Sequence, residues 1–434
     1  MTAECASADR VGTITMDAAL QDAFAYTFPL YEMARTRHNA LHAPAPARSA
    51  QVNQLRHRRT LSDHRARAVT TPNNDTLYSS AWLDLSGGPL ELQVPAMGAR
   101  YWSVQFLDAH TGTAAVAGTR NGLGTAQRLW IAHADDPATP PAGMHAVRLP
   151  TRDAWLLARI LVDGAQDLAA VHALQDGLTL HALGSGAEPV PEPRPIAPQP
   201  PAGLPQDAAN FLAVVNEALR RNAMSRNAQP PDPAWQPLGV GAPPGAQALE
   251  RWTQALPALA ARLDMARGAR TVRGWSYPDP AIGTYGADHA LRAGVARSGL
   301  GALPLSEALY LLAGTDAQGE PLDGRWRYRV RLPAQGLEAK AFWSLSMYQE
   351  EADGRLFFVD NPIARYALGD RSSLPRSAQG EAEILVQHAP PDAQASWLPA
   401  PTGPFRLMLR AYLPGEALLK GQAPLPVIER LPPR

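Results

Sequence analysis

One sequence pattern occurs twice in this chain, far apart, and constrains the fold more than any other feature. The stretches Leu77 to Asp84 and Leu309 to Asp316 both read Leu-Tyr-x-x-Ala-x-x-Asp. Five residues after each Asp comes Pro-Leu followed by an acid, and the motifs Pro-Ala-x-Gly and Trp-Ser then follow in the same order in both halves. The repeat predicts one β-rich unit used twice and joined by a different kind of segment.

The length and charge of the chain limit its class. A chain of 434 residues is too long for one small core, so two domains are expected. The 45% hydrophobic content is ordinary for a globular protein. The 40 basic and 40 acidic residues balance, and no long basic run is present. We therefore expect no nucleic-acid partner and no patch for an anionic membrane.

The cysteine count and the N-terminus bear on the compartment. Cys5 is the only cysteine, so neither an intrachain disulfide nor a cysteine-based metal site is expected. Residues 1–10 lack the apolar core of a signal peptide, and no stretch approaches the ~20 apolar residues of a membrane-spanning helix. The expectation is a cytoplasmic protein as written, or a periplasmic or exported one if a leader has been removed.

Short β-like segments separated by turn residues fill both halves of the chain. The first half contains candidate strands at 77–85, 90–94, 101–107, 128–131 and 155–162, and the second half at 326–332, 342–348, 356–359, 383–388 and 405–413. Strands and helices do not alternate, which argues against a parallel α/β sheet. The predicted fold is mainly β with α: two β-sandwich or jelly-roll-like domains from an internal duplication, with helical connecting segments.

Changes in composition suggest the domain boundaries. An amphipathic helix should begin at an Asp17 N-cap, continue through Leu20 and Tyr31, and be kinked at Pro29. The proline-rich stretch 184–205 is expected to be an extended linker. The predicted units are an N-terminal helix and polar segment (1–70), the first β-sandwich (71–183), the linker (184–205), a helical connector (206–300) and the second β-sandwich (301–434).

Two long stretches resemble catalogued families. Residues 71–85, TPNNDTLYSSAWLDL, resemble the signature of domain of unknown function 1254, and 161–164 with 171–176 fit its end. Residues 341–348, 359–363, 365–370 and 397–401 resemble its usual partner, domain of unknown function 1214. The resemblance implies two β-sandwich domains with helical connections and members that often carry an export or lipoprotein leader. It implies no established reaction.

The segment before the first repeat offers the first candidate site. Asn73, Asn74 and Asp75 lie just before Tyr78, and we expect them to have no counterpart before the second copy, where Leu-Pro-Leu-Ser-Glu stands instead. Amide and carboxylate groups could bind ligand hydroxyls or a hard cation, and Tyr78 lies within reach. The alternative is an Asx-turn that satisfies its own backbone at the entry to a strand.

A carboxylate pair would provide acid and base groups. Asp75 and Asp108 could form such a pair, as glycoside chemistry requires, if their strands lie side by side. His110 and Arg120 follow the same strand and could complete a polar cleft. Against this, acidic residues at strand ends are often simple turn formers.

Other polar groups are weaker candidates. Asn361 and Arg365 in the second half could bind a ligand, although a buried turn network explains them equally well. His38 and His42 have helical spacing, but prolines follow at once and no catalytic Glu accompanies them, so metal binding is disfavoured. No organic cofactor is expected.

Two functions remain open. One is a cofactor-independent hydrolase or lyase acting on a polar small molecule or glycan, with Asp75 and Asp108 as catalytic groups. The other is a non-catalytic ligand-binding or oligomeric scaffold protein. We expect a homo-oligomer in either case. The segment from Tyr285 to Arg292 is predicted to form an interdomain or subunit contact.

Overall fold

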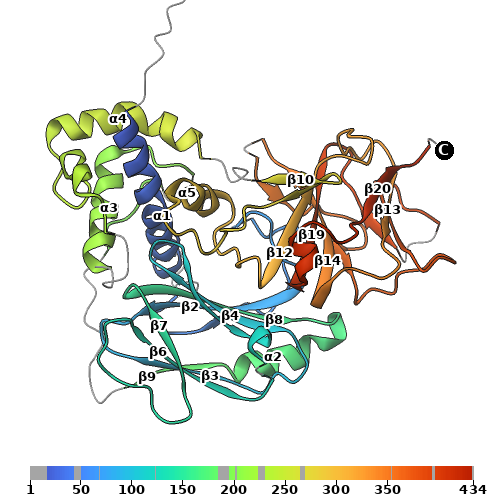
Figure 1. The fold of residues 1–434 in the computed structure, drawn as a ribbon, viewed down its shortest axis with the longest axis horizontal. Helices are drawn as coiled ribbons and strands as arrows, with labels where there is room; N and C mark the ends of the chain where they lie inside the picture. The colour runs from blue at the N-terminus through green and yellow to red at the C-terminus, as the bar shows by residue number, and fades with distance from the viewer. Residues whose placement is uncertain are drawn as a thin grey trace, which may run out of the picture.

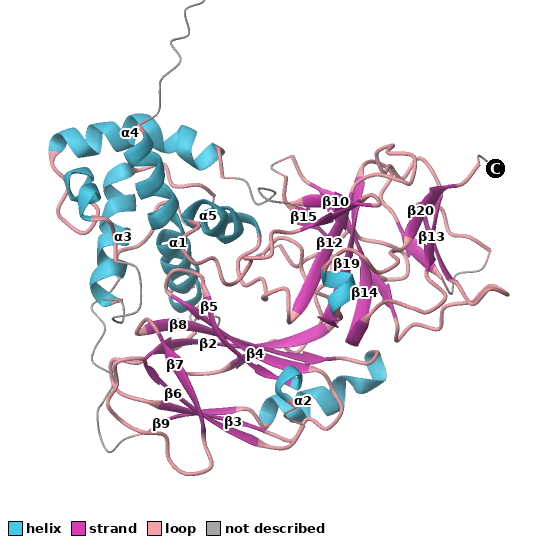
Figure 2. Cartoon of the chain, viewed as in Figure 1, coloured by secondary structure: helices cyan, strands magenta, loops and turns pink. Residues whose placement is uncertain are grey.

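The structure is a computed structural model that describes residues 17–43, 50–67, 69–122, 124–183, 195–200, 203–222, 230–263, 269–352, 354–392 and 396–432. Three bodies are apparent: a helical module, a first β-sandwich that lies against it, and a second β-sandwich beside the first (Figure 1). The secondary structure separates in the same way, with most helices in one body and strands in the other two (Figure 2). Within the described residues, no helix is long and apolar enough to cross a membrane.

The helical module combines the N-terminal helix with helices from the middle of the chain. Its helices are α1 (Ala18–Leu41), α3 (Ala208–Arg221), α4 (Ala246–Ala261) and α5 (His289–Ser298), with the 3-10 helix η4 (Pro233–Leu238). The predicted N-cap is confirmed, since Asp17 accepts a hydrogen bond from the backbone N–H of Ala19 at 3.0 Å. Pro29 lies inside α1 and is buried. Phe24, Phe211 and Trp252 form the aromatic centre of this core.

The first sandwich packs two sheets face to face. One sheet has the order β1 (Arg56–His57), β2 (Thr76–Asp84), β8 (Asp153–Leu161), β4 (Trp102–Asp108) and β5 (Thr113–Gly118). The other has the order β7 (His145–Leu149), β6 (Gln127–His133), β3 (Leu90–Val94) and β9 (Thr179–Ala182). Leu77, Leu92 and Ile131 from the two sheets meet in one core. Helix α2 (Leu168–Asp176) and the 3-10 helices η2 (Thr119–Asn121) and η3 (Ala165–Asp167) complete this body.

The second sandwich has the same plan. One sheet has the order β10 (Arg270–Val272), β11 (Trp275–Tyr277), β12 (Ala308–Ala313), β19 (Phe405–Pro414), β14 (Ala339–Glu350) and β15 (Leu356–Phe357), with β16 (Ala367–Gly369) also paired to β14. The other has the order β18 (Trp397–Pro399), β17 (Ala382–Gln387), β13 (Tyr328–Leu332) and β20 (Val427–Arg430). The short helix α6 is Glu416–Leu419. Strand β13 shows the alternation of buried and half-buried residues expected of a strand with one face on a core.

The strand pairing is equivalent in the two sandwiches. The order β2-β8-β4-β5 corresponds to β12-β19-β14-β16, and β7-β6-β3-β9 corresponds to β18-β17-β13-β20. In each body one outer pair is parallel, β6 with β7 and β17 with β18. Tyr78 stands opposite Arg159 across β2 and β8, as Tyr310 stands opposite Arg410 across β12 and β19.

The expected strands are present, with shifts at their ends. The candidate at 326–332 begins only at Tyr328, and the one at 356–359 is reduced to Leu356–Phe357. Most of the proline-rich segment lies outside the described residues, which include only 195–200 and 203–205 of it. Nine strands of the described residues were not anticipated: β1, β5, β7, β9, β10, β11, β16, β18 and β20. All but β5 and β7 have only two to four residues, too few to show an apolar alternation.

A candidate functional site between the two sandwiches

The turn at Asn73 connects the first sandwich to the second. Asn73 Oδ1 accepts hydrogen bonds from the backbone N–H groups of Asp75 (2.6 Å) and Thr76 (3.3 Å), so the Asx-turn alternative describes it locally. Its Nδ2 also donates to the hydroxyl of Tyr412 at 2.7 Å. Tyr348 donates to the carbonyl oxygen of Pro72 at 2.6 Å. The turn therefore forms part of the contact between the sandwiches.

Asp75 is held by the second sandwich on both carboxylate oxygens. Its Oδ2 accepts from the hydroxyl of Ser344 at 2.6 Å, and its Oδ1 forms an ion pair with Arg371 at 2.8 Å. The Asp75 side chain is 3% exposed, whereas that of Arg371 is 22% exposed. The acid is thus inside the interface and the guanidinium nearer its edge.

A mirrored ion pair lies across the same interface. Glu307, three residues before Tyr310 as Asp75 is three before Tyr78, accepts from Arg120 Nε at 3.0 Å and from the hydroxyl of Tyr101 at 2.8 Å. Arg120 follows Gly118 by two residues, just as Arg371 follows Gly369. The expectation that the first-copy segment has no counterpart was therefore wrong: Glu307 occupies the position of Asp75. Burial raises the pKa of Glu307, and the hydrogen bonds from Tyr101 and Arg120 partly offset that rise.

Two buried arginines occupy the centre of this interface. Arg159 is 4% exposed and donates to Gln105 Oε1 (3.0 Å) and to the carbonyl oxygen of Gly301 (2.8 Å). Arg410 is 2% exposed and donates to the hydroxyl of Ser346 (2.8 Å) and to the carbonyl oxygen of Thr71 (2.9 Å). Among the described residues, neither guanidinium has a carboxylate within the 4.0 Å of an ion pair.

Tyrosine side chains surround the two guanidinium groups. The guanidinium carbon of Arg159 lies 5.2 Å from the ring centre of Tyr78, and that of Arg410 lies 5.9 Å from the ring centre of Tyr310. Burial raises the pKa of Tyr310, and more strongly that of Tyr412. Yet Tyr78 and Tyr310 are only half-buried. Tyr78 and Tyr310 are therefore less buried than the guanidinium groups beside them.

Asp108 and His110 lie elsewhere, so the expected carboxylate pair is not formed. The backbone of Asp75 bonds to Val162, one residue past the end of β8, whereas Asp108 pairs with Ala154 near the start of that strand. At ~3.3 Å per residue, the two acids are roughly 25 Å apart along the strand. A glycosidase-type pair needs carboxyl groups within about 10 Å. Asp108 and His110 face the helical module, and only Asp75 and Arg120 belong to the interface.

His110 is buried in an unusual setting. It is fully buried, and neither ring nitrogen has a hydrogen-bond partner among the described residues. Its ring lies edge-on to Tyr26 at 5.3 Å, and Tyr26 lies edge-on to His289 at 5.1 Å. Burial lowers the pKa of His110 to about 3, with smaller contributions from Arg292 and His289. Asp108 accepts from the backbone N–H groups of His110 and Gly112, and burial raises its pKa.

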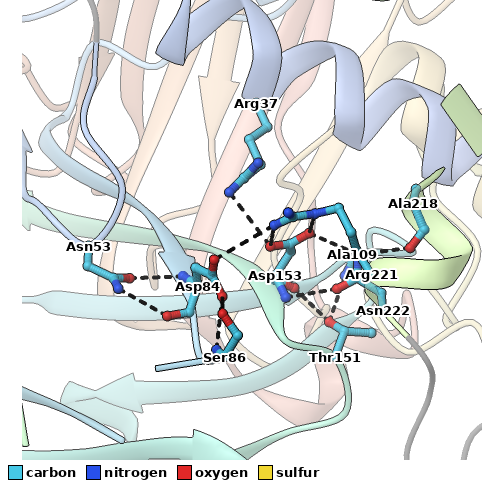
Figure 3. Close-up of polar contacts among 10 residues, drawn as sticks. All are labelled: Arg37, Asn53, Asp84, Ser86, Ala109, Thr151, Asp153, Ala218, Arg221 and Asn222. Carbon is cyan, nitrogen blue, oxygen red and sulfur yellow. Dashed lines mark hydrogen bonds and ion pairs between the residues drawn. The ribbon is translucent and has the colours of Figure 1, made fainter. Parts of the chain in front are cut away.

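A second charged network fastens the helical module to the first sandwich (Figure 3). Asp153 on β8 accepts from Arg221 Nη2 (2.6 Å), Arg221 Nε (3.0 Å) and Asn222 Nδ2 (3.0 Å) on α3. Arg37 on α1 lies 3.6 Å away. Burial acts to raise the pKa of Asp153, but Arg37 and Arg221 outweigh it and the pKa is lowered. The carboxylate contacts of Asp153 with Arg37, Arg221 and Asn222 all join the first sandwich to the helical module, which identifies a structural hub.

The remaining candidates form local turns. Asn74 donates to the carbonyl oxygen of Ser62 at 2.5 Å. Asn361 accepts from the backbone N–H of Arg365 at 3.0 Å and donates to its carbonyl oxygen. The guanidinium of Arg365 donates to the carbonyl oxygen of Trp397 at 2.8 Å. These contacts form a turn network, as in the alternative given for Asn361 and Arg365, but both residues are half-buried and not buried as that alternative expected.

The internal repeat indicates part of this site. Tyr310 and Glu307 follow from aligning the second repeat on Tyr78 and Asp75. Arg159 and Arg410 could not be recognised without the pairing of β2 with β8 and of β12 with β19, since both lie within apolar strands.

Comparisons with known proteins match this architecture. The family model described as "Protein of unknown function (DUF1254)" matches residues 52–182, and "Protein of unknown function (DUF1214)" matches residues 307–416. The chain carries the paired DUF1254 and DUF1214 domains. The DUF1254 match covers the first sandwich with Asp75, and the DUF1214 match covers β12 to β19 with Glu307 and Arg410.

Solved structures resemble the DUF1254–DUF1214 chain in fold. The VPA0106 protein from Vibrio parahaemolyticus is 22% identical, with a TM-score of 0.72 over 95% of this chain and 99% of that one. An uncharacterized protein from Burkholderia cenocepacia is 14% identical, with a TM-score of 0.46 over 94% of this chain and 88% of that one, which is too low to support an argument. No curated protein matches the chain. The Vibrio structure supports the fold alone.

Proposed function

We propose that this chain is a ligand-binding protein that holds a small anionic molecule between its two sandwiches. The observation that carries the proposal is the pair of buried guanidinium groups of Arg159 and Arg410, which lack a carboxylate partner among the described residues. Moving a charge out of water costs several kcal/mol even after relaxation, unless an opposite charge compensates for it. An anionic ligand would supply that opposite charge.

The charge balance of the interface supports this choice. Arg371 with Asp75 and Arg120 with Glu307 form two neutral pairs. Arg159 and Arg410 are then left without a carboxylate at ion-pair distance among the described residues, and only Glu307 and Asp75, acting from further away, offset their charges. Carboxylate and phosphate groups match the planar fork of a guanidinium, and phenol hydroxyls can donate further hydrogen bonds to their oxygens. A neutral glycan would leave both charges in place.

The geometry favours binding over the hydrolase or lyase hypothesis. Both oxygens of Asp75 are engaged, by Ser344 and by Arg371, which leaves it poorly placed to accept a proton from a substrate. Asp108, the second proposed catalytic group, is roughly 25 Å away by the strand spacing. With that pair separated, no acid–base couple remains for the reaction that was expected.

We also propose that the two halves derive from an internal duplication and pair as two subunits of a dimer would. Three observations support this proposal: the strand registers are equivalent, each half pairs an acid with an arginine of the other half, and each half donates a guanidinium hydrogen bond to the other. Arg159 donates to the carbonyl oxygen of Gly301, and Arg410 donates to that of Thr71. Such an arrangement resembles an isologous interface within one chain. The expected homo-oligomer stays a prediction, which light scattering during size-exclusion chromatography can check.

Ligand-dependent melting tests the binding proposal. Wild type, Arg159→Gln and the control Arg128→Gln are melted with inorganic phosphate or citrate, against sodium chloride of equal ionic strength. Arg128 is a half-exposed arginine on β6 that pairs with Glu91, remote from the interface. We expect at least one anion to raise the Tm of wild type and of Arg128→Gln but not of Arg159→Gln. An equal rise in all three proteins, or no rise in any, would overturn the proposal.

A further inference from the structure

We infer that the ligand carries two acid groups, one facing Arg159 and the other facing Arg410, as in a small dicarboxylate. This inference rests on the proposed function and specifies its ligand class. It is carried by the two-fold equivalence of the polar groups that line the interface.

Each sandwich contributes the same set of groups at the same strand positions. Arg159 pairs in register with Tyr78 and Ser103, and Arg410 pairs in register with Tyr310 and Ser344. The interface therefore offers two similar half-sites, each with one guanidinium beside one phenol ring. A single acid group can occupy only one of them.

The two half-sites share one set of phenols. Tyr310 lies within electrostatic range of both Arg159 and Arg410, and so does Tyr412. The hydroxyl of Tyr412 in turn accepts from Asn73. Both guanidinium groups thus lie beside one cluster of phenol rings, which is where a ligand that contacts both would have to bind.

Charge compensation then distinguishes the ligand classes. A monoacid would neutralise one buried guanidinium and leave the other uncompensated, whereas a diacid would neutralise both. The cross-domain ion pairs Arg371–Asp75 and Arg120–Glu307 already satisfy the other two arginines, so no third acid group is required. The aromatic rings beside the arginines suit a short apolar spacer between the two acids.

Calorimetric titration with matched acids tests the inference. Succinate, glutarate and adipate are compared with butyrate and with inorganic phosphate at equal ionic strength, on wild type, Arg159→Gln, Arg410→Gln and the control Arg128→Gln. We expect at least one diacid to bind wild type and Arg128→Gln at least tenfold more tightly than butyrate. Each interface variant should lose that advantage and bind the diacid no better than wild type binds butyrate.

The outcomes separate this inference from the proposed function. If butyrate or phosphate binds as tightly as every diacid, and binding still requires Arg159, the anion site stands and the two-acid inference fails. If none of the probes binds wild type, the proposed function fails as well. Arg159→Lys keeps the positive charge and so controls for a folding defect in Arg159→Gln. This variant should retain part of the preference for diacids. A folded Arg159→Lys protein that showed no such preference would also contradict the inference.

Discussion

The buried imidazole of His110 should make the stability of this protein depend on pH in a predictable way. Burial lowers its pKa to about 3 in the folded chain, whereas an unfolded histidine titrates at about 6.5. Below about pH 6.5 the unfolded chain binds a proton that the folded chain does not. The free energy of unfolding should therefore fall as the pH falls from about 6.5 towards 3.

The size of the effect follows from the two pKa values. Each pKa unit corresponds to about 1.4 kcal/mol, so at pH 4.5, two units below 6.5, His110 should cost about 2.7 kcal/mol of stability. The groups around the ring are Tyr26, His289 and Arg292, while Asp108 accepts from the backbone N–H of His110. The cation Arg292 opposes protonation of His110, whereas no hydrogen-bond acceptor among the described residues stabilises the protonated ring.

The assay compares His110→Gln with wild type by urea unfolding at pH 7.5 and pH 4.5. Intrinsic tryptophan fluorescence follows unfolding, and Trp235, whose ring lies 5.1 Å from that of Tyr26, is one of its sources. Wild type should lose about 2.7 kcal/mol more than His110→Gln between the two pH values. His145→Gln removes an exposed histidine on β7 and should follow wild type. If wild type and His110→Gln lose the same free energy, the ring is protonated in the folded state and the reasoning is refuted.

Two further predictions concern the hub and the repeat. Asp153→Asn should lower the free energy of unfolding by about 3–5 kcal/mol, because it leaves Arg221 and Arg37 without their buried acid. The control Asp135→Asn removes an exposed acid and should change the free energy of unfolding little. Urea unfolding measures both variants. Gly118→Ala and Gly369→Ala should destabilise the protein to a similar degree, by about 1–3 kcal/mol each, since a Cβ would lie 2.4 Å and 2.3 Å from a backbone carbonyl oxygen on the neighbouring strand. Gly87→Ala, where an added Cβ would meet open space, is the control, and thermal melts compare the three variants. A large difference between Gly118→Ala and Gly369→Ala would argue against equivalent packing in the two sandwiches.

The sequence predicted the β-rich architecture because the repeat and the turn residues are local signals. Leu77 to Asp84 and its second copy fell on β2 and β12 nearly as expected. The association of α1 with helices from the middle of the chain could not be predicted, because it depends on long-range packing of side chains such as Phe24 against Phe211.

The candidate site was only partly predictable for a related reason. Asn73, Asp75, Tyr78 and Arg120 were chosen for their polarity, and the structure brings all four to the interface between the sandwiches. The predicted pairing of Asp75 with Asp108 was wrong, because a residue near the end of a strand in the sequence can lie at either end of the sheet. Arg159 and Arg410 lie within apolar strands, and the strand register is needed to see that each one points towards the other sandwich.

A crystal structure of the protein soaked in sodium bromide, with anomalous diffraction recorded at the bromine edge, tests the central claim most directly. A bromide ion is small enough to enter a narrow space, and it should seek buried positive charge that lacks a carboxylate partner. The account predicts anomalous peaks between the sandwiches, beside Arg159 and beside Arg410. Peaks confined to the outer surface, with both guanidinium groups enclosed by protein alone, would contradict it and make the two arginines purely structural clamps.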